Sequence, residues 1–184
     1  MKTYDELVSL FESANANFLE ADHSLFRNTV SERTLCGALM LHIHDIIKKD
    51  PSFAGYYADV EYNRNKGGIK TIRKTIRGVN EEIIPINCDL ILHSRGENTE
   101  QDNLIAIEMK KSSQPPEKRQ SDRDRLIALT KDSVVGVRVG NNNLPEHVCG
   151  YVLGIYYEIN YSEKQILTEY YHRGELVSSR YIKI

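Results

Sequence analysis

Two apolar runs separated by nine polar residues limit the folds open to this chain. The runs Glu81–His93 (EEIIPINCDLILH) and Asn103–Lys110 (NLIAIEMK) are rich in aliphatic residues and are typical of strands. A parallel crossover needs a dozen or more residues, so the segment 94–102 (SRGENTEQD) is too short for one. The sequence therefore predicts an antiparallel hairpin, with Pro85 marking a bulge or an edge position in its first strand.

Helical periodicity precedes this hairpin. Thr3–Glu6 (TYDE) has the form of a capping box, and apolar residues then recur at helical spacing, which predicts a first helix. A second predicted helix begins at Ser31, a favourable N-cap residue, and ends where Asp50 precedes Pro51. Glu32 lies at the head of the apolar stripe of the second helix, so we expect it near the sheet.

Further elements lie on both sides of the hairpin. The alternating segment Tyr56–Asn63 predicts a strand, whereas the amphipathic segment 69–78 (IKTIRKTIRG) fits a short helix as well as a loop. Ser121–Asp124 (SDRD) has the form of a capping box and predicts a helix that ends at Lys131. A long strand over 148–159 is expected to follow this helix.

The last predicted element is a β-hairpin that turns at Arg173 and Gly174. The full order is then α, α, β, β, β, α, β and a β-hairpin. It predicts an α/β fold with a mixed central sheet flanked by helices. A length of 184 residues is typical of one domain, so we expect a single domain over 1–184.

Composition restricts location and cysteine chemistry. No apolar run approaches the ~20 residues of a membrane helix, and the first residues lack the apolar region of a signal peptide. We therefore expect a cytoplasmic protein with no membrane contact. Cys36, Cys88 and Cys149 lie far apart with no C-x-x-C pair, which predicts reduced thiols and no zinc site.

Charged residues within the apolar runs suggest chemistry. Glu108 and Lys110 are two residues apart on a predicted strand, so their side chains share one face. Asp89 heads the apolar part of the neighbouring strand, and Glu32 adds a carboxylate from the second helix. Carboxylates on adjacent strands can converge on one cation, and Mg²⁺ is usually held by one or two of them. This pattern predicts a metal site.

Simpler interpretations of the same residues exist. Glu108 and Lys110 can form an ordinary ion pair on a solvated strand face. Glu32 can offset the partial positive charge at a helix N-terminus. His93 has the same parity as Asp89, which would bring it near a substrate, although a histidine at a strand end is commonly structural.

The combination of an acid before one strand, a hairpin, and acid-x-Lys at the end of the next strand resembles the PD-(D/E)XK nuclease superfamily. Asp89, Glu108 and Lys110 match its motif, and Glu32 matches its helical glutamate. The resemblance implies a restriction-endonuclease-like αβββαβ core over about 31–159, with the first helix and the terminal hairpin as additions. Cys88 stands where the motif usually has proline.

The resemblance also implies roles and a cofactor. Asp89 and Glu108, with the carbonyl of Met109, would hold Mg²⁺ or Mn²⁺. Lys110 would orient the attacking water, and Glu32 would assist as an outer carboxylate. The implied reaction is hydrolysis of phosphodiester bonds in nucleic acid, with DNA favoured over RNA and RNA left open. Family members without a separate recognition domain often work as dimers, so the resemblance allows a homodimer.

A basic segment supports a nucleic acid partner despite the net charge of −2. Residues 64–77 contain six basic residues and no acid. Phosphate contacts supply most non-specific affinity for nucleic acid, so the expected contact residues are Lys70, Arg73, Lys74, Arg77 and Lys111. A solvated face is the simpler interpretation of the same segment. The alternative to a nuclease is a non-catalytic module on the same fold that binds nucleic acid or protein.

Overall fold

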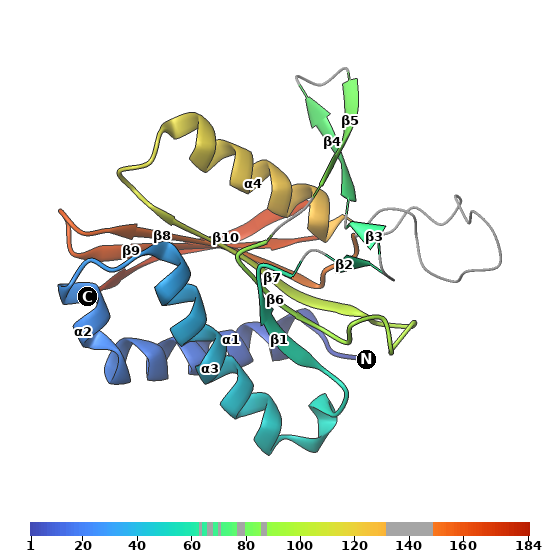
Figure 1. The fold of residues 1–184 in the computed structure, drawn as a ribbon, viewed down its shortest axis with the longest axis horizontal. Helices are drawn as coiled ribbons and strands as arrows, with labels where there is room; N and C mark the ends of the chain where they lie inside the picture. The colour runs from blue at the N-terminus through green and yellow to red at the C-terminus, as the bar shows by residue number, and fades with distance from the viewer. Residues whose placement is uncertain (63, 66–67, 70, 77–79, 86–87, 132–148) are drawn as a thin grey trace.

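A six-stranded mixed sheet forms the centre of the fold (Figure 1). The computed structural model describes residues 1–62, 64–65, 68–69, 71–76, 80–85, 88–131 and 149–184, and between 63 and 87 it describes the backbone alone. In spatial order, the strands are β1 (Tyr57–Val60), β6 (Leu90–His93), β7 (Asn103–Lys111), β8 (Leu153–Asn160), β9 (Gln165–His172) and β10 (Glu175–Lys183). The β7–β8 pair is parallel and the other pairs are antiparallel.

Helices cover both faces of the sheet (Figure 1). The helices α1 (Tyr4–Ala21), α2 (His23–Arg27) and α3 (Glu32–Lys49) pack on one side, followed by the short 3-10 helix η1 (Pro51–Phe53). The helix α4 (Pro116–Thr130) lies on the other side, in the crossover from β7 to β8. Among the described residues, no helix is long and apolar enough to cross a membrane.

Local sequence explains where α1 and α3 begin. Thr3 and Glu6 form the expected capping box, in which each side chain bonds the backbone N–H of the other residue. The hydroxyl of Ser31 accepts a hydrogen bond from the N–H of Thr34 and caps α3. Both predicted helix starts are confirmed.

The two hairpins predicted within the sheet are also confirmed. In the β6–β7 hairpin, Leu90 lies opposite Ile107, and the pairing is antiparallel. The β9–β10 hairpin turns at Arg173 and Gly174, whose φ angles of 51° and 79° are left-handed. Glycine adopts such angles without steric cost, which favours a tight turn at this position.

The segment between β1 and β6 differs from the prediction. Residues 71–76 form a strand, β4 (Thr71–Ile76), which pairs with β5 (Asn80–Pro85), and a short pair of β2 (Arg64–Asn65) and β3 (Gly68–Ile69) precedes it. The helix or loop expected here is therefore wrong, because β-branched threonine and isoleucine favour an extended backbone over a helix. The predicted strand Glu81–His93 is two strands, with β5 ending at Pro85.

The start of α4 also differs from the prediction. The helix begins at Pro116, where proline fits the first turn, and the expected capping box at Ser121 lies inside it. Asp122 is consequently an interior helix residue and is only 5% exposed. The predicted start at Ser121 is five residues too late, because Pro115 and Pro116 mark the start of the helix.

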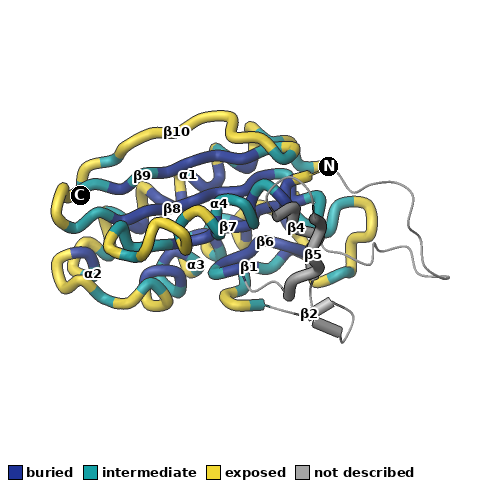
Figure 2. Tube along the Cα trace, turned by 90° about the horizontal axis from the view of Figure 1, so that it is seen from above, coloured by how far each residue is buried: buried dark blue, intermediate teal, exposed yellow. Residues whose placement is uncertain are grey.

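The two faces of the sheet are packed differently. The main apolar core lies between the sheet and the helices α1 and α3, and it includes Phe11, Phe18, Leu39 and Met109. A smaller cluster lies under α4 and includes Leu126 and Leu129. The central strands are buried along most of their length, whereas β10 is exposed at one edge of the sheet (Figure 2).

Candidate metal and catalytic site

Asp89 lies directly before β6 and is tied to β7. Its Oδ2 accepts a hydrogen bond of 2.8 Å from the N–H of Met109, the residue between Glu108 and Lys110. Burial raises the pKa of Asp89, and the charges of Asp122 and Glu32 add to the rise, while the Met109 N–H and Lys110 oppose it. The bond holds a half-buried carboxylate beside the acid-x-Lys pair.

Glu108 is a buried carboxylate on the α4 side of β7. It is 1% exposed, and its Oε1 accepts a hydrogen bond of 2.6 Å from Nη1 of Arg125 in α4. Burial raises the pKa of Glu108 to about 8, with Asp89 and Asp122 contributing, although Arg125 acts in the opposite direction. The charges of Asp89 and Glu108 therefore act on each other, and a divalent cation between them would offset this repulsion.

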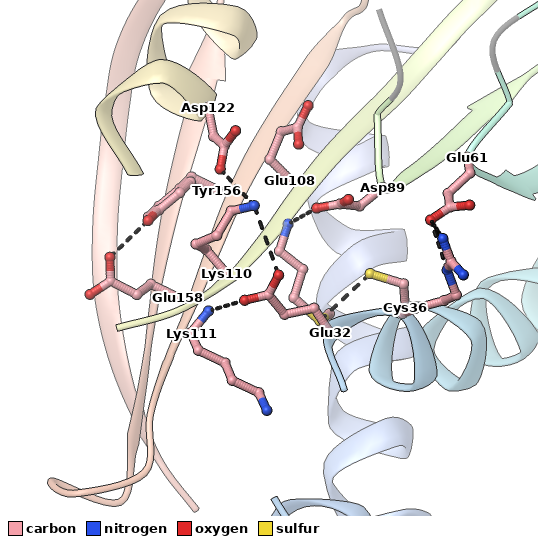
Figure 3. Close-up of polar contacts among 12 residues, drawn as sticks. Glu32, Cys36, Glu61, Asp89, Glu108, Lys110, Lys111, Asp122, Tyr156 and Glu158 are labelled. Carbon is pink, nitrogen blue, oxygen red and sulfur yellow. Dashed lines mark hydrogen bonds and ion pairs between the residues drawn. The ribbon is translucent and has the colours of Figure 1, made fainter. Parts of the chain in front are cut away.

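Lys110 lies between carboxylates from two helices (Figure 3). Its Nζ is 3.1 Å from Oδ2 of Asp122 in α4 and 3.8 Å from Oε2 of Glu32 in α3. Burial disfavours the charged form, but the charges of Asp122, Asp89 and Glu32 outweigh it and raise the pKa of Lys110. The side chain is thus a charged ammonium group in a fixed position, which suits a role in orienting water or offsetting negative charge.

Glu32 links the N-terminus of α3 to the end of β7. Its Oε1 accepts a hydrogen bond of 2.8 Å from the N–H of Lys111, while its Oε2 faces Lys110. Glu32 therefore bonds a strand outside its own helix, and compensation of the helix dipole alone does not explain this contact. The side chain of Lys111 turns elsewhere, with its Nζ 3.2 Å from the carbonyl of Thr29.

Asp122, like Arg125, is a residue of the site that the sequence did not indicate. Its Oδ1 is 3.3 Å from Arg125, and its Oδ2 accepts no hydrogen bond from any described residue although Lys110 lies near it. The signal was available in principle, because a helix that starts at Pro116 places Asp122, Arg125 and Leu129 on one face. A buried carboxylate oxygen without a hydrogen bond fits a place beside a cation.

A cleft of about 370 Å³ opens next to Asp89 and Glu32. Across it, Arg33 of α3 and Glu61 after β1 form an ion pair of 2.7 Å. Glu61 has a left-handed φ of 50°, and its N–H donates to the carbonyl of Asp89. The cleft thus places the exposed Arg33 beside two predicted site residues.

The predicted nucleic acid contacts are only partly described. Lys70 and Arg77 lie outside the described residues, and for Arg73 and Lys74 only the backbone of β4 is described. The hairpin of β4 and β5 approaches α4, the helix that carries Asp122 and Arg125 (Figure 1). The proposed contacts of all four basic residues stay predictions.

His93 has a structural environment. It is 1% exposed, and its Nε2 lies 3.0 Å from Oδ2 of Asp59, which also binds Arg95. Tyr62 packs edge-on against the imidazole ring. These contacts favour the structural interpretation of His93.

The donor chemistry of the site fits a hard divalent cation, since Asp89, Glu108, Glu32 and Asp122 all offer carboxylate oxygens. Within the described ranges, no three His, Cys, Asp or Glu side chains are arranged to hold a metal ion. Magnesium often takes one or two carboxylates and completes its coordination with water and phosphate, so it does not need such a trio. The carbonyl of Met109 stays a predicted ligand.

Comparison with known proteins assigns no family to this chain. No protein-family model, no curated protein and no solved structure matches it.

Proposed function

We propose that this chain is a divalent-metal-dependent nuclease with a restriction-endonuclease-like core. The elements α3, β1, β6, β7, α4 and β8 follow one another in the order αβββαβ, with the hairpins β2–β3 and β4–β5 inserted after β1. This order supports the named core over about 31–159. It also puts the predicted acids before β6 and near the end of β7.

The hydrogen bond from Met109 to Asp89 is the observation that carries the proposal. It joins the carboxylate before β6 to the backbone between Glu108 and Lys110, across two neighbouring strands. An ordinary exposed ion pair would not need this placement, and Glu108 and Lys110 are both directed to α4 rather than to each other. Buried charges are costly unless they are paired or bind a metal ion.

Each residue then has a role in phosphodiester hydrolysis. Asp89 and Glu108 would hold Mg²⁺ or Mn²⁺, with the Met109 carbonyl as a further ligand. The bound ion would lower the pKa of a water molecule and offset charge on the phosphate. Lys110 would orient the attacking water, while Glu32 and Asp122 keep its ammonium group in place. Arg125 keeps the Glu108 side chain in place through the hydrogen bond that it donates to Oε1.

A cleavage panel tests the proposal. Purified wild type is incubated with DNA and RNA, single- and double-stranded, in Mg²⁺, Mn²⁺ or EDTA. We expect metal-dependent cleavage of DNA that Asp89→Asn and Lys110→Ala each reduce by more than about 100-fold, since even outer-shell partners of a metal contribute 10–100-fold. Asp45→Asn, a matched change at an exposed carboxylate of α3, should cleave like wild type. Cleavage that Asp89→Asn retains would contradict the proposal.

A non-catalytic binding module is the second candidate. The close contact between Arg125 and Glu108 favours it, because the arginine already supplies a positive charge to the buried carboxylate. Such a module would shift nucleic acid on a gel in EDTA, would not cleave it in Mg²⁺, and would tolerate Lys110→Ala. This result would replace the nuclease proposal.

A further inference from the structure

The two edges of the sheet differ in length and exposure. The strand β1 at one edge has four residues, and such short edges resist unwanted pairing. At the other edge β10 has nine residues, eight of them exposed, and no other strand within the described part of the chain pairs with its outer side (Figure 2). A strand of this length presents about 30 Å of unpaired backbone.

The exposed edge carries large apolar side chains. Leu176 and Val177 are each 53% exposed, and Tyr181 is 67% exposed. Exposed apolar residues scattered singly are normal, but here three of them are on one edge strand. Charges discourage an edge from pairing with other chains, and β10 carries them only at Glu175, Arg180 and Lys183.

A bulge decides which of these side chains share a face. Leu176 lies opposite Tyr171 and Tyr181 lies opposite Leu167, and these two β9 residues are four positions apart. Opposite residues of an antiparallel pair share a face, so Leu176 and Tyr181 both lie on the face of Tyr171, which packs under α4. Leu176 and Tyr181 share this face although they are five positions apart along β10, because Val177 is the extra residue of the bulge.

We propose that two copies of this chain associate through β10, antiparallel, with Ser179 of each copy opposite Ser179 of the other. In the ladder of paired residues, Val177 of the bulge has no partner and is not counted. Leu176 is then two pairs from Ser179 in one direction, and Tyr181 is two pairs from it in the other. The two-fold axis therefore puts each Leu176 opposite Tyr181 of the second copy. Both apolar residues become covered, and the backbone of each edge gains hydrogen bonds.

Other registers of the pair formed by the two β10 strands cover less of Leu176 and Tyr181. With the axis at Arg180, Leu176 would face Lys183 and Tyr181 would face Ser179. With the axis at Ser178, Tyr181 would extend past the end of the pair. On the α1 face the chosen register places Ser178 beside Arg180 of the second copy, and that arginine keeps its ion pair with Glu12 of its own chain. The small serine leaves room for this ion pair.

Mass measurement with a charge swap tests the interface. Wild type should reach twice the 21.1 kDa chain mass as its concentration rises in sedimentation equilibrium. Leu176→Lys with Tyr181→Lys puts like charges opposite each other and should weaken association at least about 10-fold. Leu176→Glu with Tyr181→Lys puts opposite charges there and should restore much of it. Leu41→Lys, at an α3 leucine that is 59% exposed, should associate like wild type.

Cysteine cross-linking tests the register. In a Cys149→Ser background, Ser179→Cys should form a disulfide-linked dimer on oxidation, because the two residues 179 face each other. Ser178→Cys should cross-link far less, since diagonal positions lie beyond disulfide reach. Circular dichroism confirms that each variant is folded. A wild type that stays monomeric would overturn the proposal. A dimer that the double lysine variant does not weaken, or equal cross-linking at positions 178 and 179, would overturn it as well.

Discussion

The two faces of the central sheet are closed by different physical means. Under α1 and α3 the contact is apolar, with Phe11, Leu39 and Ile107 fully buried. Under α4 a smaller apolar cluster is bordered by ion pairs, because α4 sends Arg119, Arg123 and Arg125 toward Glu158, Glu169 and Glu108 of the strands. Hydrophobic burial stabilises without regard to direction, whereas buried ion pairs stabilise little and mainly fix positions.

The difference indicates a division of labour within the fold. The α1 and α3 face supplies the free energy that holds the sheet together. The α4 face holds carboxylates and cations in set positions near the candidate site, at a cost in desolvation. Variants on each face should therefore fail in different ways.

Leu39→Ala should cause the largest loss of stability. The side chain is fully buried in the middle of α3, and leucine-to-alanine changes of this kind cost about 4 kcal/mol in unfolding free energy. Urea denaturation measures the loss. The metal affinity of the folded fraction, measured by calorimetry, should equal that of wild type. Weaker binding to a fully folded variant would show that the apolar face also sets the site geometry.

Glu108→Gln should change how stability depends on pH. The pKa of Glu108 is raised from 4.5 to about 8 in the folded chain, so folding binds a proton between these values and stability falls as the pH rises through that window. Without metal, wild type should lose about 3 kcal/mol relative to Glu108→Gln between about pH 5 and 7.5. Thermal and urea unfolding in EDTA measure the difference. Parallel pH profiles for the two proteins would refute the buried, proton-binding state of Glu108.

Arg123→Met should cost about 3 kcal/mol, because it leaves the buried Glu169 without its cation. Arg123 also lies over the ring of Tyr156, so the lost contact is not only electrostatic. Glu169→Gln added to Arg123→Met should recover part of the loss in a double-mutant cycle. Strictly additive losses would mean that the pair does not hold α4 to β9.

Arg33→Ala should have the smallest effect, on substrate affinity rather than stability. Its ion pair with Glu61 is largely exposed, and such pairs contribute little, so the arginine can exchange Glu61 for a phosphate. If the chain is a nuclease, its affinity for duplex DNA in EDTA should fall about 3-fold. The slope of the logarithm of the binding constant against the logarithm of salt concentration should become shallower by about one. Arg27→Ala, an exposed arginine of α2, is the control. Equal effects of both changes would mean that the cleft does not take phosphate.

Sequence reasoning predicted the starts of α1 and α3 and the shared face of two residues of β7, but it missed the strand β4 and the start of α4. The two-residue period of a strand is fixed, so Glu108 and Lys110 could be assigned to one face, and both contact α4. The isoleucines of 69–76 fit a helical spacing as well as a strand, and pairing with β5 decided between them. Asp122 and Arg125 were missed because their contacts with β7 depend on how α4 packs across the sheet, which local pattern does not encode.

The pair of β7 with β8, the one parallel pair among the described strands, has a consequence for the order of folding. The chain must run from Lys111 through α4 and on to Leu153 before this pair can form, which is a long loop to close. Hairpins such as β6–β7 and β9–β10 close much shorter loops and can form earlier. We therefore expect the β7–β8 pair to form late, so that a partly folded chain has hairpins but an incomplete sheet.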